Sequence, residues 1–373
     1  MLIFLVVFII VIFLMQQYSK KNALKGIKYD YQFSKKLIEI GEPVELISII
    51  TNESRRFISF VRMVENFPKG IQALNKKVFI RKATIGLGYW SYNSSIYLMA
   101  RSRLQRKLKL TFNKRGRYVF RGATLHGGDF LGLSEKRKKF ELSRELIVYP
   151  KLIDAPQINE IMGGFLGDIS VRRFIMEDPI LTVGTREYTG REPLKQMSWK
   201  HTARTNQMMG NHQMMVKQFD YTTEMVVTVF LDISAVKGKT LTPQQFENCF
   251  SLARTVCQYL EQKKIPFEFL SNATIEGTDD DEQRLVKGLG KAHLRSILER
   301  LGRAGYGTRE SYESAIDKLA LNQEKNRSTV IITPQRDANK QSLAEKLQEK
   351  TVGALIFIYG EDFTEREDED GIS

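Results

Sequence analysis

Two arginines and two aromatic residues stand close together in one stretch of this 373-residue sequence: Arg186, Tyr188, Trp199 and Arg204. A guanidinium group is a permanent donor that pairs with carboxylates through two hydrogen bonds and stacks on aromatic rings. This combination predicts a structural clamp that holds the stretch against the domain that follows it. Contact with a ligand or a protein partner is the alternative that the same residue types support.

Histidine and glycine patterns give no sign of a catalytic centre. The four histidines show neither the HExxH pattern nor another paired-ligand spacing: His126, His201, His212 and His293. The stretch Gly288–Lys291 lacks the upstream glycine and the downstream serine or threonine of a phosphate-binding loop. The sequence therefore predicts that the protein is not an enzyme, and no small-molecule substrate is evident in it.

The only two cysteines, Cys249 and Cys257, lie eight residues apart in a helix-like stretch. Two thiols without a neighbouring His/Cys cluster form neither a zinc site nor a redox motif. We therefore expect both to be small apolar core residues. The chain is then independent of disulfides, as intracellular proteins are.

The positive charge of the chain is concentrated in its N-terminal half. The sequence holds 57 Lys and Arg against 43 Asp and Glu, a net charge of +14, and residues 1–224 carry +18 while the remainder carries −4. The densest basic cluster, from Arg101 to Arg117, lacks the interleaved aromatic residues of a single-strand binder and the helical context of a groove reader. We therefore predict solvated strand faces there and no nucleic acid as a partner.

The chain begins with fourteen consecutive apolar residues, from Leu2 to Met15, and its first basic residue is Lys20. Fourteen helical residues rise about 21 Å against a hydrocarbon core of about 30 Å, so the span is short. With cations only on the C-terminal flank, the pattern predicts an uncleaved transmembrane anchor over residues 1–19 that contacts membrane lipid. The expected localisation is the cell membrane, single-pass, with the bulk of the chain cytoplasmic. A buried core helix and an atypical signal peptide are the alternatives.

Two further regions differ in their hydrophobic period. Residues 28–155 alternate apolar and polar side chains in short runs bounded by turn residues, which predicts an antiparallel β-sandwich. From about residue 225, strands such as Met225–Asp232 alternate with amphipathic helices such as Pro243–Lys264, which predicts a parallel sheet covered by helices. The last residues, 364–373, are strongly acidic and predict a polar tail.

The stretch from 186 to 204 resembles the signature of a bacterial family, the domain of unknown function fifty-eight. The residues that carry the resemblance are Arg186, Tyr188, Gly190, Trp199, Ala203 and Arg204. The sequence departs from the family pattern at Arg191, where the family has an aspartate. The resemblance implies that the motif residues contact a partner or hold the segment in place.

The resemblance also implies a layout and a partner. Members of the family combine an N-terminal membrane segment, a β-rich region and a C-terminal von Willebrand factor A-like domain, which here falls with the signature in residues 170–363. They often lie beside AAA+ ATPases of the MoxR type. The resemblance therefore implies an ATPase of this type as a partner and implies no known chemistry.

Domains of the von Willebrand A type can hold a divalent cation through an Asp-x-Ser-x-Ser motif after the first strand. Asp232 and Ser234 match this motif, whereas Val236 replaces the second serine and Pro334 stands where a later aspartate is expected. Mg²⁺ prefers six oxygen ligands in near-octahedral geometry, so the loss of two ligands weakens the site. We therefore expect no cofactor, with Asp232 and Ser234 as polar groups that end the strand and cap a helix, while Mg²⁺ bound by these two residues is the alternative.

The sequence as a whole predicts an α/β plus β fold class: an N-terminal membrane helix, an antiparallel β-sandwich and a von Willebrand A-like, Rossmann-like parallel sheet flanked by helices. The predicted function is that of a membrane-anchored, non-enzymatic adaptor that works with a MoxR-type AAA+ ATPase. The alternative is a divalent-metal-dependent protein-binding or hydrolytic domain that uses Asp232.

Overall fold

The computed structural model divides the chain into two compact units. The residues described are 24–73, 89–128, 135–154, 156–175, 182–190, 192–209, 213–219, 226–277, 285–322, 327–350 and 353–363, with Phe4, Val7, 10–14 and Gln17. The N-terminal unit comprises Met1–Lys151, Ile275–Gly277 and Leu298–Gly305. The C-terminal unit comprises Leu152–Thr274, Thr278–Ile297 and Tyr306–Ser373.

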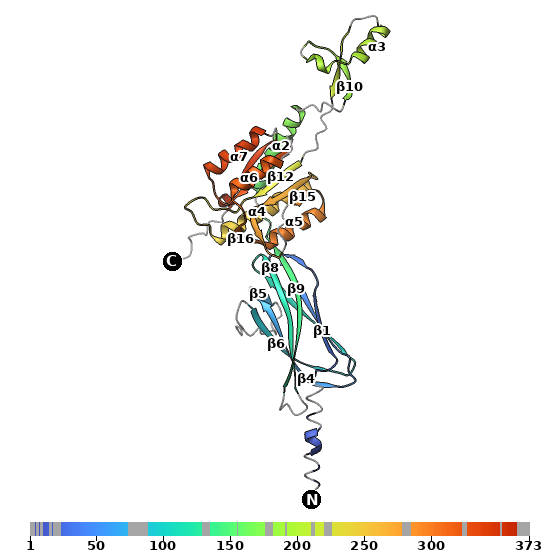
Figure 1. The fold of residues 1–373 in the computed structure, drawn as a ribbon, viewed down its shortest axis with the longest axis vertical. Coiled ribbons are helices and arrows are strands. Elements are labelled where there is room, and N and C mark those ends of the chain that lie inside the picture. Colours follow the sequence, from blue (N-terminus) through green and yellow to red (C-terminus); the bar gives the residue numbers. More distant parts are fainter. Residues whose placement is uncertain are drawn as a thin grey trace. The chain divides into compact units, whose positions relative to one another are not determined.

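The N-terminal unit contains two β-sheets (Figure 1). The first is antiparallel, with the order β1 (Ile27–Phe33), β3 (Val44–Asn52), β7 (Arg103–Phe112) and β5 (Ile71–Ala73). The second has the order β2 (Leu37–Glu39), β9 (Glu135–Tyr149), β8 (Gly116–Gly128), β4 (Ile58–Pro68) and β6 (Tyr89–Leu98). In this second sheet β2 and β9 run parallel, and the other neighbours run antiparallel.

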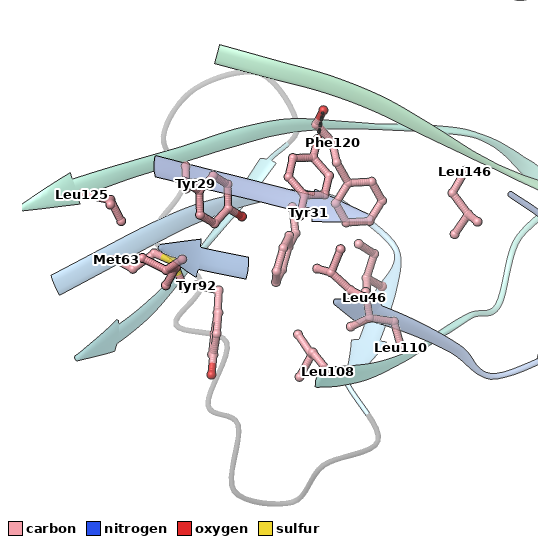
Figure 2. Packing of buried hydrophobic residues seen from close by; sticks show 14 of the residues in the cluster. Tyr29, Tyr31, Leu46, Met63, Tyr92, Leu108, Leu110, Phe120, Leu125 and Leu146 are labelled. Atoms are coloured by element: carbon pink, nitrogen blue, oxygen red, sulfur yellow. Dashed lines mark hydrogen bonds between the residues drawn. The ribbon is translucent and has the colours of Figure 1, made fainter. Parts of the chain in front are cut away.

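Side chains from both sheets form one hydrophobic core in this unit. Figure 2 shows Tyr29 and Tyr31 of β1 packed among side chains such as Met63 of β4 and Phe120 of β8. The core follows from the period of two in the strands, because successive side chains point to opposite faces of a sheet. Every second residue of β3 is buried along its whole length.

The C-terminal unit is built on a five-stranded mixed sheet. Its order is β15 (Leu285–Gly288), β13 (Phe267–Ser271), β12 (Val226–Leu231), β17 (Arg327–Thr333) and β18 (Leu355–Tyr359). The pairs β12–β13, β12–β17 and β17–β18 are parallel, and β13–β15 is antiparallel. All six residues of the central strand β12 are buried, as expected of an interior strand.

Along the chain, the described helices before or between these strands, besides α3 (Trp199–Met209), are α2 (Pro156–Ile175), α4 (Pro243–Gln262), α5 (Lys291–Arg303), α6 (Tyr312–Asn322) and α7 (Ala338–Lys350). The part of α5 from Leu298 onward belongs to the N-terminal unit. Side chains of α6 and α7 share a core cluster with Phe230 and Ile331 of the sheet. The helix α4 begins with a capping box in which Thr242 and Gln245 satisfy each other's backbone N–H groups. A short pair, β14 (Ala273–Ile275) and β16 (Ala304–Thr308), and the 3-10 turn η3 (Gly360–Phe363) complete these elements.

The stretch between α2 and β12 forms a small substructure of its own. It consists of β10 (Thr182–Glu187), the 3-10 turn η1 (Leu194–Gln196), α3 (Trp199–Met209) and β11 (Met215–Phe219). The strands β10 and β11 pair antiparallel with a bulge. We call these elements the motif hairpin, because they contain the arginines and aromatic residues singled out in the sequence.

The prediction of a membrane anchor is corrected by the structure. Within the described part of the chain, no helix is long and apolar enough to cross a membrane. The predictions of a transmembrane anchor over residues 1–19 and of a single-pass localisation in the cell membrane are therefore wrong. The run from Leu2 to Met15 has fourteen apolar residues, fewer than the about 20 of a typical spanning helix. Most of residues 1–19, and all of the predicted acidic tail 364–373, lie outside the described residues.

The predicted fold class is wrong in its sheets as well. More of the described residues lie in strands than in helices, and the von Willebrand A-like parallel sheet is replaced by a mixed one. The strand β15 runs antiparallel to β13, which makes the sheet mixed. The N-terminal unit is not purely antiparallel either, since β2 pairs parallel with β9.

Candidate functional site

The first candidate site lies at the carboxyl ends of β12 and β17, where Asp232 directly follows β12. Its side chain is fully buried. The backbone N–H of Asp232 donates to the carbonyl of Ile332 at 2.8 Å, which holds the residue level with the end of β17. Ligands of open α/β sheets commonly bind at such strand ends.

One carboxylate oxygen of Asp232 is held by its own loop and by the neighbouring strand end. Its Oδ1 accepts from the backbone N–H of Ser234 at 2.9 Å and from Ser234 Oγ at 2.6 Å. The same oxygen accepts from Asn272 Nδ2 at 2.6 Å, and Asn272 Oδ1 accepts from the N–H of Ile233 at 2.9 Å. Asp232 and Ser234 are thus bonded to each other at the strand end. The N-cap of the next helix, α4, is Thr242, so the prediction that Asp232 and Ser234 cap a helix is wrong.

The other carboxylate oxygen is held from β17 and α7. Asp232 Oδ2 accepts from Thr333 Oγ1 at 3.1 Å and from the ammonium of Lys340 at 2.6 Å. Lys340 lies in the first turn of α7, and its side chain is only 8% exposed. Five donors thus converge on one buried carboxylate, which leaves it fully hydrogen-bonded.

The surroundings of this carboxylate disfavour negative charge on neighbouring groups. Burial, and after it the charge of Asp232, raises the pKa of the Cys249 thiol well above its usual range. Burial and Asp232 likewise raise the pKa of the Tyr312 phenol. Cys257 is also buried, and its pKa is raised by burial alone. Both thiols therefore stay protonated at neutral pH and have the environment of inert core residues, as predicted.

The second candidate site is the motif hairpin. Arg186, on β10, forms an ion pair with Glu192, with 2.5 Å between Nη1 and Oε1. Glu192 also accepts from the backbone N–H of Thr189 at 3.1 Å and from Thr189 Oγ1 at 2.8 Å. These bonds close the turn that contains Gly190, whose φ of +88° is a left-handed conformation that glycine adopts without strain.

Hydrogen bonds to β11 hold the start of α3 in place. The N–H of Ser198 donates to the carbonyl of Met215 at 2.8 Å, and Thr202 Oγ1 accepts from the N–H of Met215 at 2.9 Å. Ser198 and Thr202 are buried, as are the side chains of Met197 and Val216. A small buried centre thus fixes where Trp199, the first residue of α3, projects.

Large apolar side chains of the motif hairpin remain exposed. Trp199 is 66% exposed, Leu194 on η1 is 68% exposed and Met214 before β11 is 47% exposed. Because Ser198 is bonded to Met215, their neighbours Trp199 and Met214 lie at the same end of the hairpin. We call Leu194, Trp199 and Met214 the Trp199 surface.

The predicted motif residues are brought together only in part. Arg186, Tyr188 and Gly190 lie on β10 and the turn after it, while Trp199 and Arg204 lie on α3. Arg186 pairs with a carboxylate as the clamp prediction expects, although the partner is the local Glu192. Trp199 is exposed rather than covered by an arginine, and Arg204 is also exposed. Arg191, the departure from the family pattern, lies outside the described residues.

Four residues of these sites were not singled out in the sequence: Asn272, Thr333, Lys340 and Glu192. A signal existed for Thr333, because it immediately precedes Pro334, the position at which the metal-binding motif has a later aspartate. Lys340 had no such signal, since it is one of many lysines and lies 108 residues from its partner Asp232.

Comparisons with known proteins assign this chain to no family. No protein-family model matches the chain. No curated protein matches it either. The resemblance of the motif stretch to the domain of unknown function fifty-eight therefore stays a prediction.

Solved structures give only distant similarities. A cohesin module from a family 33 glycoside hydrolase of Clostridium perfringens is 16% identical over 33% of this chain and 96% of that one, with a TM-score of 0.24. A CARDB domain from Pyrococcus furiosus is 11% identical over 33% of this chain and 91% of that one, with a TM-score of 0.21. The C-terminal domain of wzt is 13% identical over 34% of this chain and 75% of that one, with a TM-score of 0.23. Similarities of this size support no statement about fold or function.

Proposed function

We propose that the protein is a non-enzymatic adaptor that captures a protein partner through the Trp199 surface. The observation that supports this function is the 66% exposure of the Trp199 side chain on a helix whose start is fixed by hydrogen bonds. Tryptophan is enriched among the residues that contribute most to protein binding, and an anchor held in a rigid frame loses little entropy on association.

The charge around this surface indicates the chemistry of the partner. The described residues of the motif hairpin include two acidic residues and five basic ones: Arg186, Lys195, Lys200, Arg204 and Lys217. An excess of basic residues on the hairpin that carries this apolar surface favours an acidic partner. The resemblance of this stretch suggests that the partner is an AAA+ ATPase of the MoxR type.

The Asp232 site supports the non-enzymatic part of this proposal. The buried carboxylate of Asp232 already accepts five hydrogen bonds, one of them from an ammonium group. A general base or nucleophile needs a free lone pair directed at a substrate. In the proposed function, Asp232 therefore organises the strand ends and has no catalytic role.

The test is a binding titration of the full chain with a purified MoxR-type AAA+ ATPase from the same organism. Trp199→Ala is expected to raise the Kd at least tenfold, which corresponds to about 1.4 kcal/mol. Leu321→Ala is the matched control, because Leu321 lies on α6 and is 81% exposed. It should leave the Kd unchanged.

Fluorescence gives a second readout of the same titration. Trp199 and Trp90 are the only tryptophans, so a Trp90→Phe variant reports on Trp199 alone. Burial of Trp199 by the partner should shift its emission to shorter wavelength. Unchanged emission at saturation, or equal affinity of Trp199→Ala and the parent, would show that another surface binds the partner.

A further inference from the structure

The ammonium of Lys340 has the surroundings of a bound cation. Its Nζ lies 2.6 Å from Asp232 Oδ2, 2.8 Å from the carbonyl oxygen of Ser234 and 3.4 Å from Thr333 Oγ1. A lysine ammonium has three N–H donors, and each has an oxygen acceptor here. The ring of Tyr312 lies on a further side, with its centroid 5.3 Å from Nζ.

These acceptors are the kinds of oxygen that a hard divalent cation prefers: a carboxylate, a backbone carbonyl and a hydroxyl. The Asp232 and Ser234 pair is also the part of the sequence that matches a metal-binding motif. The residues therefore do not fit a divalent metal while Lys340 is in place, because the ammonium already bonds to the oxygens that the metal would need.

The position of Lys340 is fixed by more than its own ion pair. The carbonyl oxygen of Lys340 accepts from Tyr312 Oη at 3.0 Å, and the Lys340 side chain is 8% exposed. A metal that displaced the ammonium would leave a lysine charge inside the protein without its carboxylate partner, which is strongly unfavourable. Metal binding would thus require the Lys340 side chain to leave the site.

We infer that Lys340 is the resident cation of the Asp232 site and that its ammonium takes the place of a divalent metal. The chain itself then supplies the positive charge that joins the ends of β12 and β17 to the start of α7. This inference goes beyond the adaptor proposal and does not depend on the Trp199 surface. A partner that approached this strand end would meet a site that is complete without Mg²⁺.

The first test is lysine labelling of the wild-type full chain with an acylating reagent, followed by mass spectrometry, in EDTA and in MgCl₂. Lys239 is the control within the chain, because it is exposed in the loop after Asp232. Lys340 should be labelled several-fold more slowly than Lys239 under both conditions. Labelling of Lys340 at the rate of Lys239 in EDTA, or an increase to that rate with MgCl₂, would overturn the inference.

The second test removes the ammonium and keeps the volume of the side chain. Lys340→Met should lower the Tm and create a response to MnCl₂, with a rise in Tm of about 3 °C at a tenfold excess over the Kd. The wild type and the double variant Asp232→Asn/Lys340→Met should show no such rise. A wild-type rise that Asp232→Asn abolishes, or a folded Lys340→Met without any response, would contradict a cation site filled by lysine. If Lys340→Met does not fold, the labelling of the wild type still decides the question.

Discussion

Each unit of the protein buries a carboxylate beside a cation, but the two networks join different parts of the chain. In the N-terminal unit, Glu65 on β4 is 1% exposed and forms an ion pair with Arg106 on β7. In the C-terminal unit, Asp232 is fully buried and forms an ion pair with Lys340 on α7. The first network lies in the middle of strands, and the second lies at strand ends.

The Glu65 network connects the two sheets of its unit. Glu65 Oε1 accepts from Tyr29 Oη at 2.7 Å and from Ser48 Oγ at 2.8 Å, and both donors lie on the opposite sheet. Arg106 continues the network to Ser94 of β6, with Nη1 donating to Oγ at 2.6 Å. Side chains that reach across a core in this way fix the register of the strands, because a slip of one residue would bury the wrong face.

The Asp232 network instead connects a strand end to loops and a helix start, where sheets of this kind bind ligands. Its bonds hold the loop after β12 and the first turn of α7 in place. The difference shows that the same pairing of charges can specify a core in one unit and shape a surface loop in the other. It also predicts different sensitivities to substitution.

The largest expected effect is that of Arg106→Met in the N-terminal unit. It leaves the buried carboxylate of Glu65 without a cation, and breaking such a pair costs about 3 kcal/mol. The double variant Glu65→Leu/Arg106→Met should be less destabilised than this single variant, because no buried charge remains. Urea titration measures the loss in the free energy of unfolding, with hydrogen exchange of β1, β3 and β4 as the probe of unfolding. A cost for Arg106→Met equal to that of an exposed control such as Arg103→Met would show that water already compensates Glu65.

Removal of one hydroxyl from each network should cost less. Tyr29→Phe removes a donor to Glu65, and Thr333→Val removes a donor to Asp232. Hydrogen bonds to charged groups contribute about 1.5–3 kcal/mol, so we expect about 2 kcal/mol for Tyr29→Phe. We expect about 1 kcal/mol for Thr333→Val, because its bond to Asp232 is longer, at 3.1 Å, than the 2.7 Å bond of Tyr29 to Glu65. Equilibrium unfolding measures the loss in the free energy of unfolding for each variant. A larger loss for Thr333→Val than for Tyr29→Phe would show that the strand-end network is the more tightly coupled one.

Trp199→Ala should change the free energy of unfolding by less than about 0.5 kcal/mol, because the side chain is exposed and belongs to neither network. Thr202→Val is the contrasting variant, since Thr202 is buried and bonded to Met215. Hydrogen exchange of β11 should rise in Thr202→Val and stay unchanged in Trp199→Ala. A loss of protection in Trp199→Ala would mean that the tryptophan stabilises the hairpin instead of serving as a free surface.

The smallest expected effect concerns the titration of Glu192. Hydrogen bonds from Thr189, and then the bond from Arg186, lower its pKa to about 2 from the usual 4.5. A lowered pKa in the folded chain means that this carboxylate contributes stability above about pH 4.5 and loses that contribution as the pH falls through 2. Carboxyl NMR titration should show the pKa of Glu192 rising in Thr189→Ala. An unchanged pKa in that variant would assign the effect to Arg186 alone.

Much of the local structure was predictable from residue patterns. The alternation in the N-terminal region predicted strands such as β3, and the helix predicted at Pro243–Lys264 is observed as α4. The helix α2 was missed, although its buried residues recur at helical spacing: Ile158, Met162, Phe165 and Ile169. Glycines at 163, 164 and 167 lower its intrinsic helix propensity, so packing of that apolar face stabilises it.

The direction of the strands and the partners of the buried charges were not predictable in this way. Whether β15 runs with or against β13 depends on how the connection between them folds, which no period in the sequence encodes. The motif residues were found from their types and spacing, but their spacing did not show that Trp199 would be exposed while Arg186 would pair with Glu192.

The sequence by itself determined which residues face a core, because strand and helix periods are local properties of the chain. It also placed Asp232 at the end of a buried strand. Only the tertiary structure decided that Lys340, far along the chain, supplies the cation for Asp232, and that Arg106 supplies it for Glu65. The physical reason is that an ion pair inside a protein depends on which strand ends and helix starts meet in space, and the chain between the two charges carries no local record of that meeting.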